Sequence, residues 1–180
     1  YILNHFNGIV IIDEAYIDFA QSDSMIKLIK DYNNLIISQT FSKAWALAGA
    51  RVGTAYSNKE IIGFFNKVKP PYNVSEINQE AAIEALNDTK TFNQTLGTLI
   101  NEKKRMLKEL QKLELVKKIY PSDANFLLIE VENGNSLYDE LVNNKIIIRN
   151  RGKQLNNCLR ITIGSPKEND ELLRVLNDIK

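Results

Sequence analysis

The segment "GIVIID" (residues 8–13) is an unbroken apolar run, rich in β-branched residues, that ends on an aspartate. A second run of this kind, "NLIIS", occupies residues 34–38. Runs that are apolar on both faces are typical of strands buried in a parallel sheet. We therefore predict two buried parallel strands at these positions, and they decide the fold class.

The segment between these strands predicts a helix, because its apolar side chains recur at intervals of three and four residues. Ser22 or Asp23 is placed to cap its first turn. A strand, a helix and a second strand form a βαβ unit, which predicts an α/β fold with a parallel-rich sheet. The side chains with helical spacing are Met25, Leu28, Ile29 and Tyr32.

Residues 51–57 predict a further strand, and residues 58–69 a helix that Pro70 and Pro71 terminate. A helix resumes near Ser75. Apolar side chains then recur at heptad-like spacing from Phe92 to Leu113, which fits either an amphipathic helix or a coiled coil. We favour a helix packed within its own protein, because Lys103 falls in the apolar seam.

The order of elements changes in the last third of the chain, where strands and helices follow an α+β pattern. This change predicts two structural regions, residues 1–86 and residues 87–180, the second of which includes the long helix. The predicted strands are 115–119, 125–131, 145–149 and 158–163, and the predicted helices are 135–143 and 167–180.

Composition excludes several classes of protein. The 180 residues carry 23 basic and 22 acidic side chains, so no basic surface for nucleic acid is expected. No apolar run is long enough to span a membrane. The single cysteine, Cys158, cannot form an internal disulfide and fits a reducing compartment, which predicts a cytoplasmic protein. No spacing of residues predicts a metal site, and His5 is isolated.

Charged and hydroxyl side chains follow the two parallel strands. Asp13 ends the first, while Thr40, Ser42 and Lys43 follow the second. Ligands bind at the carboxyl ends of parallel strands, so these groups are expected to share a pocket. An aspartate beside a lysine can also be a plain ion pair. Arg51 adds a fixed positive charge suited to a phosphate. An amine, an acid and an anion site are together what pyridoxal phosphate requires of a protein.

Four motifs in order resemble the histidinol-phosphate aminotransferases, which are fold-type I pyridoxal-phosphate enzymes. The resemblance runs from about residue 8 to the end and covers only the C-terminal half of such an enzyme. It implies that residues 1–86 are the C-terminal part of the cofactor-binding large domain and residues 87–180 the small domain. The motifs are "IVIIDEAYIDF" (9–19), "SQTFSKAWALAGARVG" (38–53), "KPPYNVS" (69–75) and "CLRITIGSPKEN" (158–169).

The resemblance also implies roles for the cofactor-site residues. Lys43 would hold pyridoxal phosphate as a Schiff base and then carry the substrate proton. Asp13 would pair with the pyridine nitrogen, and Tyr16 would hydrogen-bond the phenolic oxygen. By the same resemblance, the phosphate would be held by Thr40, Ser42 and Arg51.

Two arginines are candidate substrate-binding residues. Alternation in residues 158–163 places Arg160 on the face opposite Leu159 and Ile161. The resemblance implies that Arg160 binds the glutamate carboxylate and Arg149 the phosphate of histidinol phosphate. An ordinary surface arginine is the alternative for each.

The implied reaction transfers an amino group between glutamate or 2-oxoglutarate and histidinol phosphate or imidazole-acetol phosphate. The implied assembly is a homodimer. The sequence starts at Tyr1 without an initiator methionine, so we expect a piece of a longer protein that is inactive alone.

Three alternatives remain open. A threonine-phosphate decarboxylase would share the lysine and its flanking residues. The run "IVIIDEA" (9–15) also resembles the Walker B segment of an ATPase, although no phosphate-binding loop is present. A non-catalytic module that keeps only the fold is the third, and the presence of Asp13, Lys43 and Arg51 argues against it.

Overall fold

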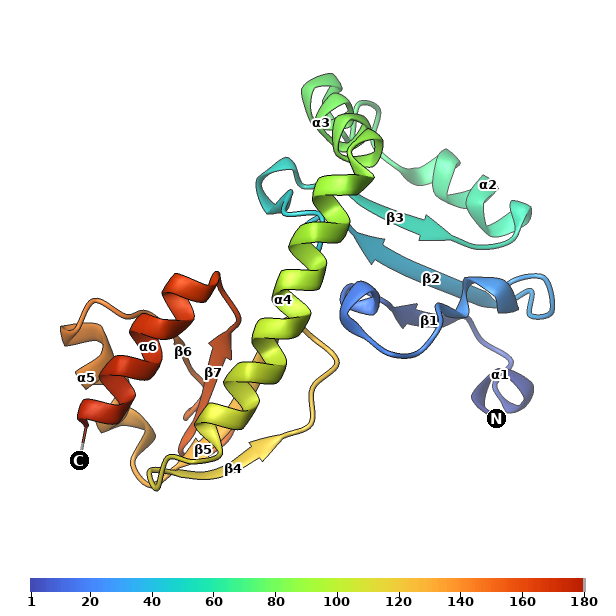
Figure 1. Ribbon diagram of the computed structural model, residues 1–180. Helices are drawn as coiled ribbons and strands as arrows, with labels where there is room; N and C mark the ends of the chain where they lie inside the picture. The colour runs from blue at the N-terminus through green and yellow to red at the C-terminus, as the bar shows by residue number, and fades with distance from the viewer. Residues whose placement is uncertain (180) are drawn as a thin grey trace. The chain divides into compact units, whose positions relative to one another are not determined.

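The computed structural model describes residues 1–179, which form two compact units with their boundary between residues 93 and 94. Each unit contains its own β-sheet, of three strands in the first and four in the second (Figure 1). Throughout the described residues, no helix has both the length and the apolar composition needed to cross a membrane.

The sheet of the first unit has the strand order β1-β2-β3. Its strands are β1 (Val10–Asp13), β2 (Leu35–Thr40) and β3 (Gly53–Tyr56). The first two strands are parallel, as predicted, with Asp13 opposite Ser38. The third runs antiparallel to β2, so the sheet is mixed. The connection before β3 contains no crossover helix, which only a parallel strand would need.

Three expectations for this unit are wrong. Leu35, Ile36 and Ile37 of β2 are buried, but β1 is an edge strand on which Ile11 is 65% exposed. The connection between β1 and β2 is also not an α-helix. It contains the short 3₁₀ helices η1 (Ile17–Phe19) and η2 (Met25–Leu28).

The cap of η2 is Ser24, whose side chain accepts a hydrogen bond from the backbone N–H of Ile26, rather than Ser22 or Asp23. The Ser24 hydroxyl and the Met25 N–H both donate to the Glu14 carboxylate, and these bonds hold the start of the segment at the strand ends.

The two other helices that the sequence predicts in the first unit begin at the expected residues. Asn58 caps α2 (Lys59–Val68), which ends just before Pro70, and Ser75 caps α3 (Glu76–Asn87). The sequence did not predict the single turn α1 (Ile2–His5) or the 3₁₀ helix η3 (Ala48–Ala50).

The second unit has an antiparallel sheet with the order β4-β5-β7-β6. The strand predicted at 145–149 is reduced to the two residues of β6. The helix predicted at 167–180 is α6, and residue 180 lies outside the described residues. The elements are α4 (Thr89–Leu110), β4 (Val116–Tyr120), β5 (Phe126–Val131), α5 (Gly134–Asn143), β6 (Arg149–Asn150), β7 (Cys158–Thr162) and α6 (Pro166–Asp178).

The core of the second unit lies between one face of this sheet and the helices α4, α5 and α6. Leu159 and Ile161 belong to it and Arg160 does not, so the predicted alternation is confirmed. Met106 and Leu110 of α4 are fully buried in the same core, which confirms a helix packed within its own protein. Lys103 donates a hydrogen bond to the backbone carbonyl of Ser122 instead of lying in a coiled-coil seam.

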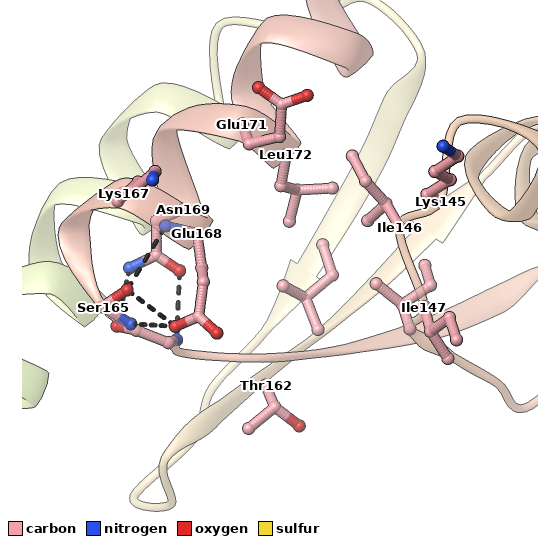
Figure 2. Close-up of a pocket in the computed structure, with 13 residues that line it drawn as sticks. Lys145, Ile146, Ile147, Thr162, Ser165, Lys167, Glu168, Asn169, Glu171 and Leu172 are labelled. Carbon is pink, nitrogen blue, oxygen red and sulfur yellow. Dashed lines mark hydrogen bonds between the residues drawn. The ribbon is translucent and has the colours of Figure 1, made fainter.

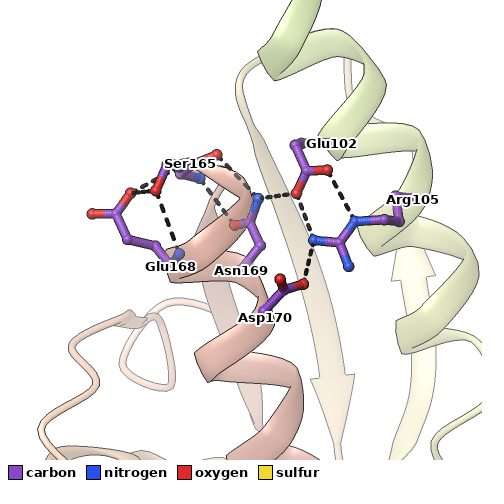
Figure 3. A network of polar contacts seen from close by, with 7 residues as sticks. Glu102, Arg105, Ser165, Glu168, Asn169 and Asp170 are labelled. Carbon is purple, nitrogen blue, oxygen red and sulfur yellow. Dashed lines mark hydrogen bonds and ion pairs between the residues drawn. The ribbon is translucent and has the colours of Figure 1, made fainter.

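A buried polar network joins α4 to the start of α6 (Figure 3). Glu102 accepts two hydrogen bonds from the Arg105 guanidinium, at 2.9 and 2.7 Å, and one from the Asn169 amide at 2.8 Å. Asn169 also bonds the backbone N–H and carbonyl of Gly164, which follows β7. The hydrogen bonds from Arg105, outweighing burial, hold the pKa of Glu102 below its usual value.

Candidate active site

The register of β1 and β2 places two polar side chains next to each other at the carboxyl edge of the first sheet. Asp13 is the last residue of β1, and its Oδ1 accepts hydrogen bonds from the Ser38 hydroxyl at 3.2 Å and the backbone N–H of Ala15 at 3.0 Å. Asp13 is exposed, so its carboxylate is available to a ligand at this edge.

The end of β2 leads into a turn that holds the predicted lysine. The backbone N–H of Ser42 donates to Thr40 Oγ1 at 3.0 Å, and the Thr40 hydroxyl donates to Ser42 Oγ at 2.9 Å. This local pairing is typical of hydroxyl side chains at turns. Lys43 follows directly and lines the same cavity as the two hydroxyls.

Arg51 lies at the other end of the loop between β2 and β3, and it lines the same site as Lys43. It adopts a left-handed backbone conformation, with φ of 53°, immediately after η3. Its Nη1 donates to the carbonyl oxygen of Ala48 at 3.0 Å, which fixes the direction of the guanidinium. The remaining N–H groups of a guanidinium can still bind an anion, because it carries five donors.

These groups line one cavity of about 460 Å³. It brings together the predicted acid, amine, hydroxyls and arginine. Tyr16 is not part of the lining, but its ring centre lies 5.4 Å from the Lys43 amine. The cavity is lined by Asp13, Ala15, Ser38, Gln39, Thr40, Ser42, Lys43, Ala48, Arg51, Val52 and Gly53.

The two predicted substrate-binding arginines form a separate pair in the second unit. Arg149 of β6 lies directly opposite Arg160 of β7. The Arg160 guanidinium lies over the Phe126 ring, 4.9 Å from its centre. Within residues 1–179 the Arg160 Nε is buried and has no hydrogen-bond partner. Two neighbouring cations and an unsatisfied N–H donor favour binding of an anion.

A larger cavity, of about 760 Å³, lies in the second unit and contains none of the predicted site residues (Figure 2). Its lining includes the apolar side chains of Ile146, Ile148 and Leu172. The polar groups at its rim bond one another, since Ser165 and Glu168 form the capping box of α6. The smaller cavity is the better candidate site, because charged groups of both signs converge on it.

Sequence reasoning missed four residues near these groups. Ser38 contacts Asp13, and Phe126 lies under Arg160. Glu14 and Gln39 hydrogen-bond each other at 2.9 Å beside the site. The one available signal was Glu14 itself, a second acid at the end of an apolar strand.

The sequence of this chain is similar to those of known aminotransferases. A model of the family "Aminotransferase class I and II" matches residues 2–176. The histidinol-phosphate aminotransferase of Flavobacterium psychrophilum is 49% identical over 177 residues, which cover 97% of this chain and 51% of that protein. The chain spans about half the length of the curated relatives it matches.

Solved structures that resemble this chain also include histidinol-phosphate aminotransferases. The histidinol-phosphate aminotransferase of Clostridium acetobutylicum superposes with a TM-score of 0.87 at 34% identity, over 95% of this chain and 54% of that one. The enzyme of this name from Sinorhizobium meliloti, solved in complex with pyridoxal-5'-phosphate, has a TM-score of 0.81 at 28% identity. That match covers 96% of this chain and 50% of the other.

Proposed function

Because the chain belongs to the aminotransferase class I and II family, we propose that it forms the C-terminal half of a pyridoxal-phosphate-dependent histidinol-phosphate aminotransferase. The proposed reaction exchanges the amino group of glutamate for the oxo group of imidazole-acetol phosphate, giving 2-oxoglutarate and histidinol phosphate, or runs in reverse. In this proposal residues 1–86 belong to the large domain and residues 87–180 to the small domain.

A single observation carries the proposal: one cavity is lined by a lysine amine, an aspartate carboxylate, two hydroxyls and an arginine. This donor set fits pyridoxal phosphate. The cofactor, when bound, supplies an electron-withdrawing ring that stabilises negative charge at the substrate α-carbon. It needs an anion site, an acid for the ring nitrogen and an amine, and the cavity has all three.

The phosphate end of the cofactor fits Thr40, Ser42 and Arg51. The guanidinium provides a fixed charge and the two hydroxyls provide neutral donors, a combination that suits a dianion. The hydroxyls already lie 2.9 Å apart, so little reorganisation is needed for both to bind one phosphate group.

The acid and the amine have different tasks. Asp13 would accept a hydrogen bond from the protonated ring nitrogen and thereby keep that proton in place. Lys43 would hold the cofactor, and its amine would carry the proton of the substrate α-carbon. Tyr16, close to the Lys43 amine, would donate to the phenolic oxygen.

The arginine pair of the second unit binds the anionic ends of the substrates. Arg160 binds the α-carboxylate of glutamate in a bidentate manner, and its orphaned Nε supports an anion partner. Arg149, directly opposite it, binds the substrate phosphate. We further propose that the enzyme acts in the cytoplasm as a homodimer and that residues 1–180 alone are inactive.

The test uses the complete gene product, purified with and without a Lys43→Ala substitution. With pyridoxal phosphate added, the unmodified protein should show a visible absorbance band that survives gel filtration, and the variant should lack it. Lys27→Ala is the matched control, since Lys27 is an exposed lysine of the same unit and its amine pairs with Asp23. It should keep the band.

The substrate assay then separates the remaining alternatives. Formation of 2-oxoglutarate from glutamate with imidazole-acetol phosphate supports the proposal, whereas release of carbon dioxide from threonine phosphate would indicate a decarboxylase instead. ATP binding without pyridoxal phosphate binding would favour the Walker B interpretation. No specific band in the complete gene product would overturn the proposed function.

A further inference from the structure

Glu14 is a buried carboxylate beside the candidate site whose contacts the proposed function does not use. The residue is only 7% exposed, although it directly follows the exposed Asp13. Its Oε1 accepts a hydrogen bond from the backbone N–H of Met25 at 2.7 Å. Its Oε2 accepts from the Ser24 hydroxyl at 2.6 Å and from the Gln39 amide at 2.9 Å. These three donors are neutral, so Glu14 is held by hydrogen bonds alone.

These bonds join the ends of the two strands that carry the site. The register of β1 with β2 ends at the pair Asp13–Ser38, and the Glu14 N–H adds one further bond to the Ser38 carbonyl at 2.8 Å. Past that point the Glu14 side chain continues the connection by reaching Gln39. Gln39 directly precedes Thr40.

We propose that Glu14 and Gln39 form a tie that positions Asp13 relative to the turn bearing Lys43. This inference rests on the proposed function. Glu14 is a positioning residue, because it lies outside the cavity lining and acts through its neighbours. The tie passes from Gln39 to Thr40 and, through the hydrogen bond that Thr40 accepts from the Ser42 N–H, to Lys43.

The spacing between Asp13 and Lys43 matters because the two side chains come from different strands and would contact the same rigid ring of pyridoxal phosphate. Misplacement of a reacting group by about 1 Å can lower a rate roughly a hundredfold. The same tie explains why the 24–25 segment stays against the strand ends without an α-helix there. Its first backbone donor and its capping hydroxyl both bond Glu14.

The tie can be tested by exchanging its two side chains, with Glu14→Gln, Gln39→Glu and the double variant that combines them. In Glu14→Gln, an amide that keeps the bond from the Met25 N–H points its own N–H at the Gln39 amide, which must turn over to accept it, and the charged acceptor is lost. In Gln39→Glu, two carboxylates face each other. In the double variant the amide at 14 donates to the carboxylate at 39, and its oxygen still accepts from Met25.

The measurements use the complete gene product and pyridoxal phosphate itself. Each single variant should bind the cofactor about tenfold more weakly, the loss expected for one hydrogen bond to a charged group. The visible circular dichroism of the bound cofactor should also weaken, since that signal reports the asymmetry of its surroundings. The double variant should recover most of both losses. Melting temperatures identify a temperature at which all variants are folded.

The outcomes separate this inference from the proposed function. Lack of a band in the unmodified protein overturns the proposed function and the tie together. If the unmodified protein binds the cofactor and the single variants match its affinity and dichroism, the tie alone is overturned, even if those variants melt earlier. Single variants that lose affinity without recovery in the double variant also overturn it.

Discussion

The two units of the chain differ in how completely they bury their apolar side chains. The contiguous core lies in the second unit, where residues such as Ile129, Leu141 and Leu159 are fully buried. The first unit buries mainly the single strand β2 and exposes many large apolar side chains. Those at least 50% exposed there are Tyr1, Ile2, Phe6, Ile9, Ile11, Phe64, Val68, Tyr72, Ile77 and Ile83.

The predicted cofactor-site residues and the larger buried core therefore lie in different units. The cofactor-site residues lie in the unit with the smaller core, on strand ends and turns held by hydrogen bonds. The arginine pair lies in the second unit, which contains the contiguous buried core. Hydrophobic burial is the dominant stabilising term in folding, so the second unit should supply most of the stability of this chain.

The largest effect is expected from Ile129→Ala in the core of the second unit. The substitution leaves a cavity among fully buried neighbours and should lower the free energy of unfolding by about 2–5 kcal/mol. Ile147→Ala is the matched control, because Ile147 is 82% exposed in the same unit. Urea unfolding of both variants measures the difference. Equal losses would contradict the assignment of the core.

A smaller loss is expected from Glu102→Gln, which disturbs the network shown in Figure 3. Hydrogen bonds to a charged group contribute about 1.5–3 kcal/mol, and Glu102 accepts such bonds from Arg105 and Asn169. Double-mutant cycles with Asn169→Ala would show whether the two residues act together. Strictly additive losses would mean that the network does not couple α4 to α6.

The same variant has a defined pH dependence. The pKa of Glu102 in the folded protein lies below its ordinary value of 4.5, chiefly through the Arg105 hydrogen bonds. The stabilisation is therefore fully present above about pH 4.5 and is lost as the pH falls through the folded pKa. The difference in unfolding free energy between the unmodified and Gln variants should shrink below pH 4.5. A constant difference would contradict this origin.

Loss of the cap at the start of α6 should cost less. Ser165 accepts a hydrogen bond from the Glu168 N–H, and Glu168 bonds back to the Ser165 N–H. Ser165→Ala removes the cap acceptor and should cost about 1 kcal/mol in denaturant unfolding. Ser165→Thr keeps a hydroxyl that can accept from the Glu168 N–H and donate to the Glu168 carboxylate, and it should recover most of that loss. Equal losses in both variants would show that the hydroxyl does not act as the cap.

Prediction from sequence succeeded where a residue pattern has one physical cause. The helices predicted over 58–69 and from near Ser75 are present, and alternation separates Arg160 from Leu159. The parallel pairing of β1 and β2 followed from two apolar runs, and it placed Asp13 near the turn with Lys43.

Prediction failed where long-range contacts override local spacing. The apolar pattern after Ser24 fits a helix, but hydrogen bonds to Glu14 hold this segment against the strand ends in a 3₁₀ turn. Glu14 gave one signal, a second acid at the end of an apolar strand, but its burial follows from its hydrogen-bond donors, which the sequence does not show. The apolar run of β1 likewise does not reveal that one side of the strand has no neighbouring strand among the described residues.

The smallest effect is expected at that edge. Ile11 is 65% exposed on β1, so Ile11→Ala removes few contacts and should change the unfolding free energy of residues 1–180 by less than about 0.5 kcal/mol. Ile37→Ala, at a fully buried position of β2, should cost several times more. Both are measured by denaturant unfolding that is followed by a probe in the first unit. A large loss at Ile11 would mean that β1 is covered in solution, and the contrast between the two units would then be smaller than the exposures indicate.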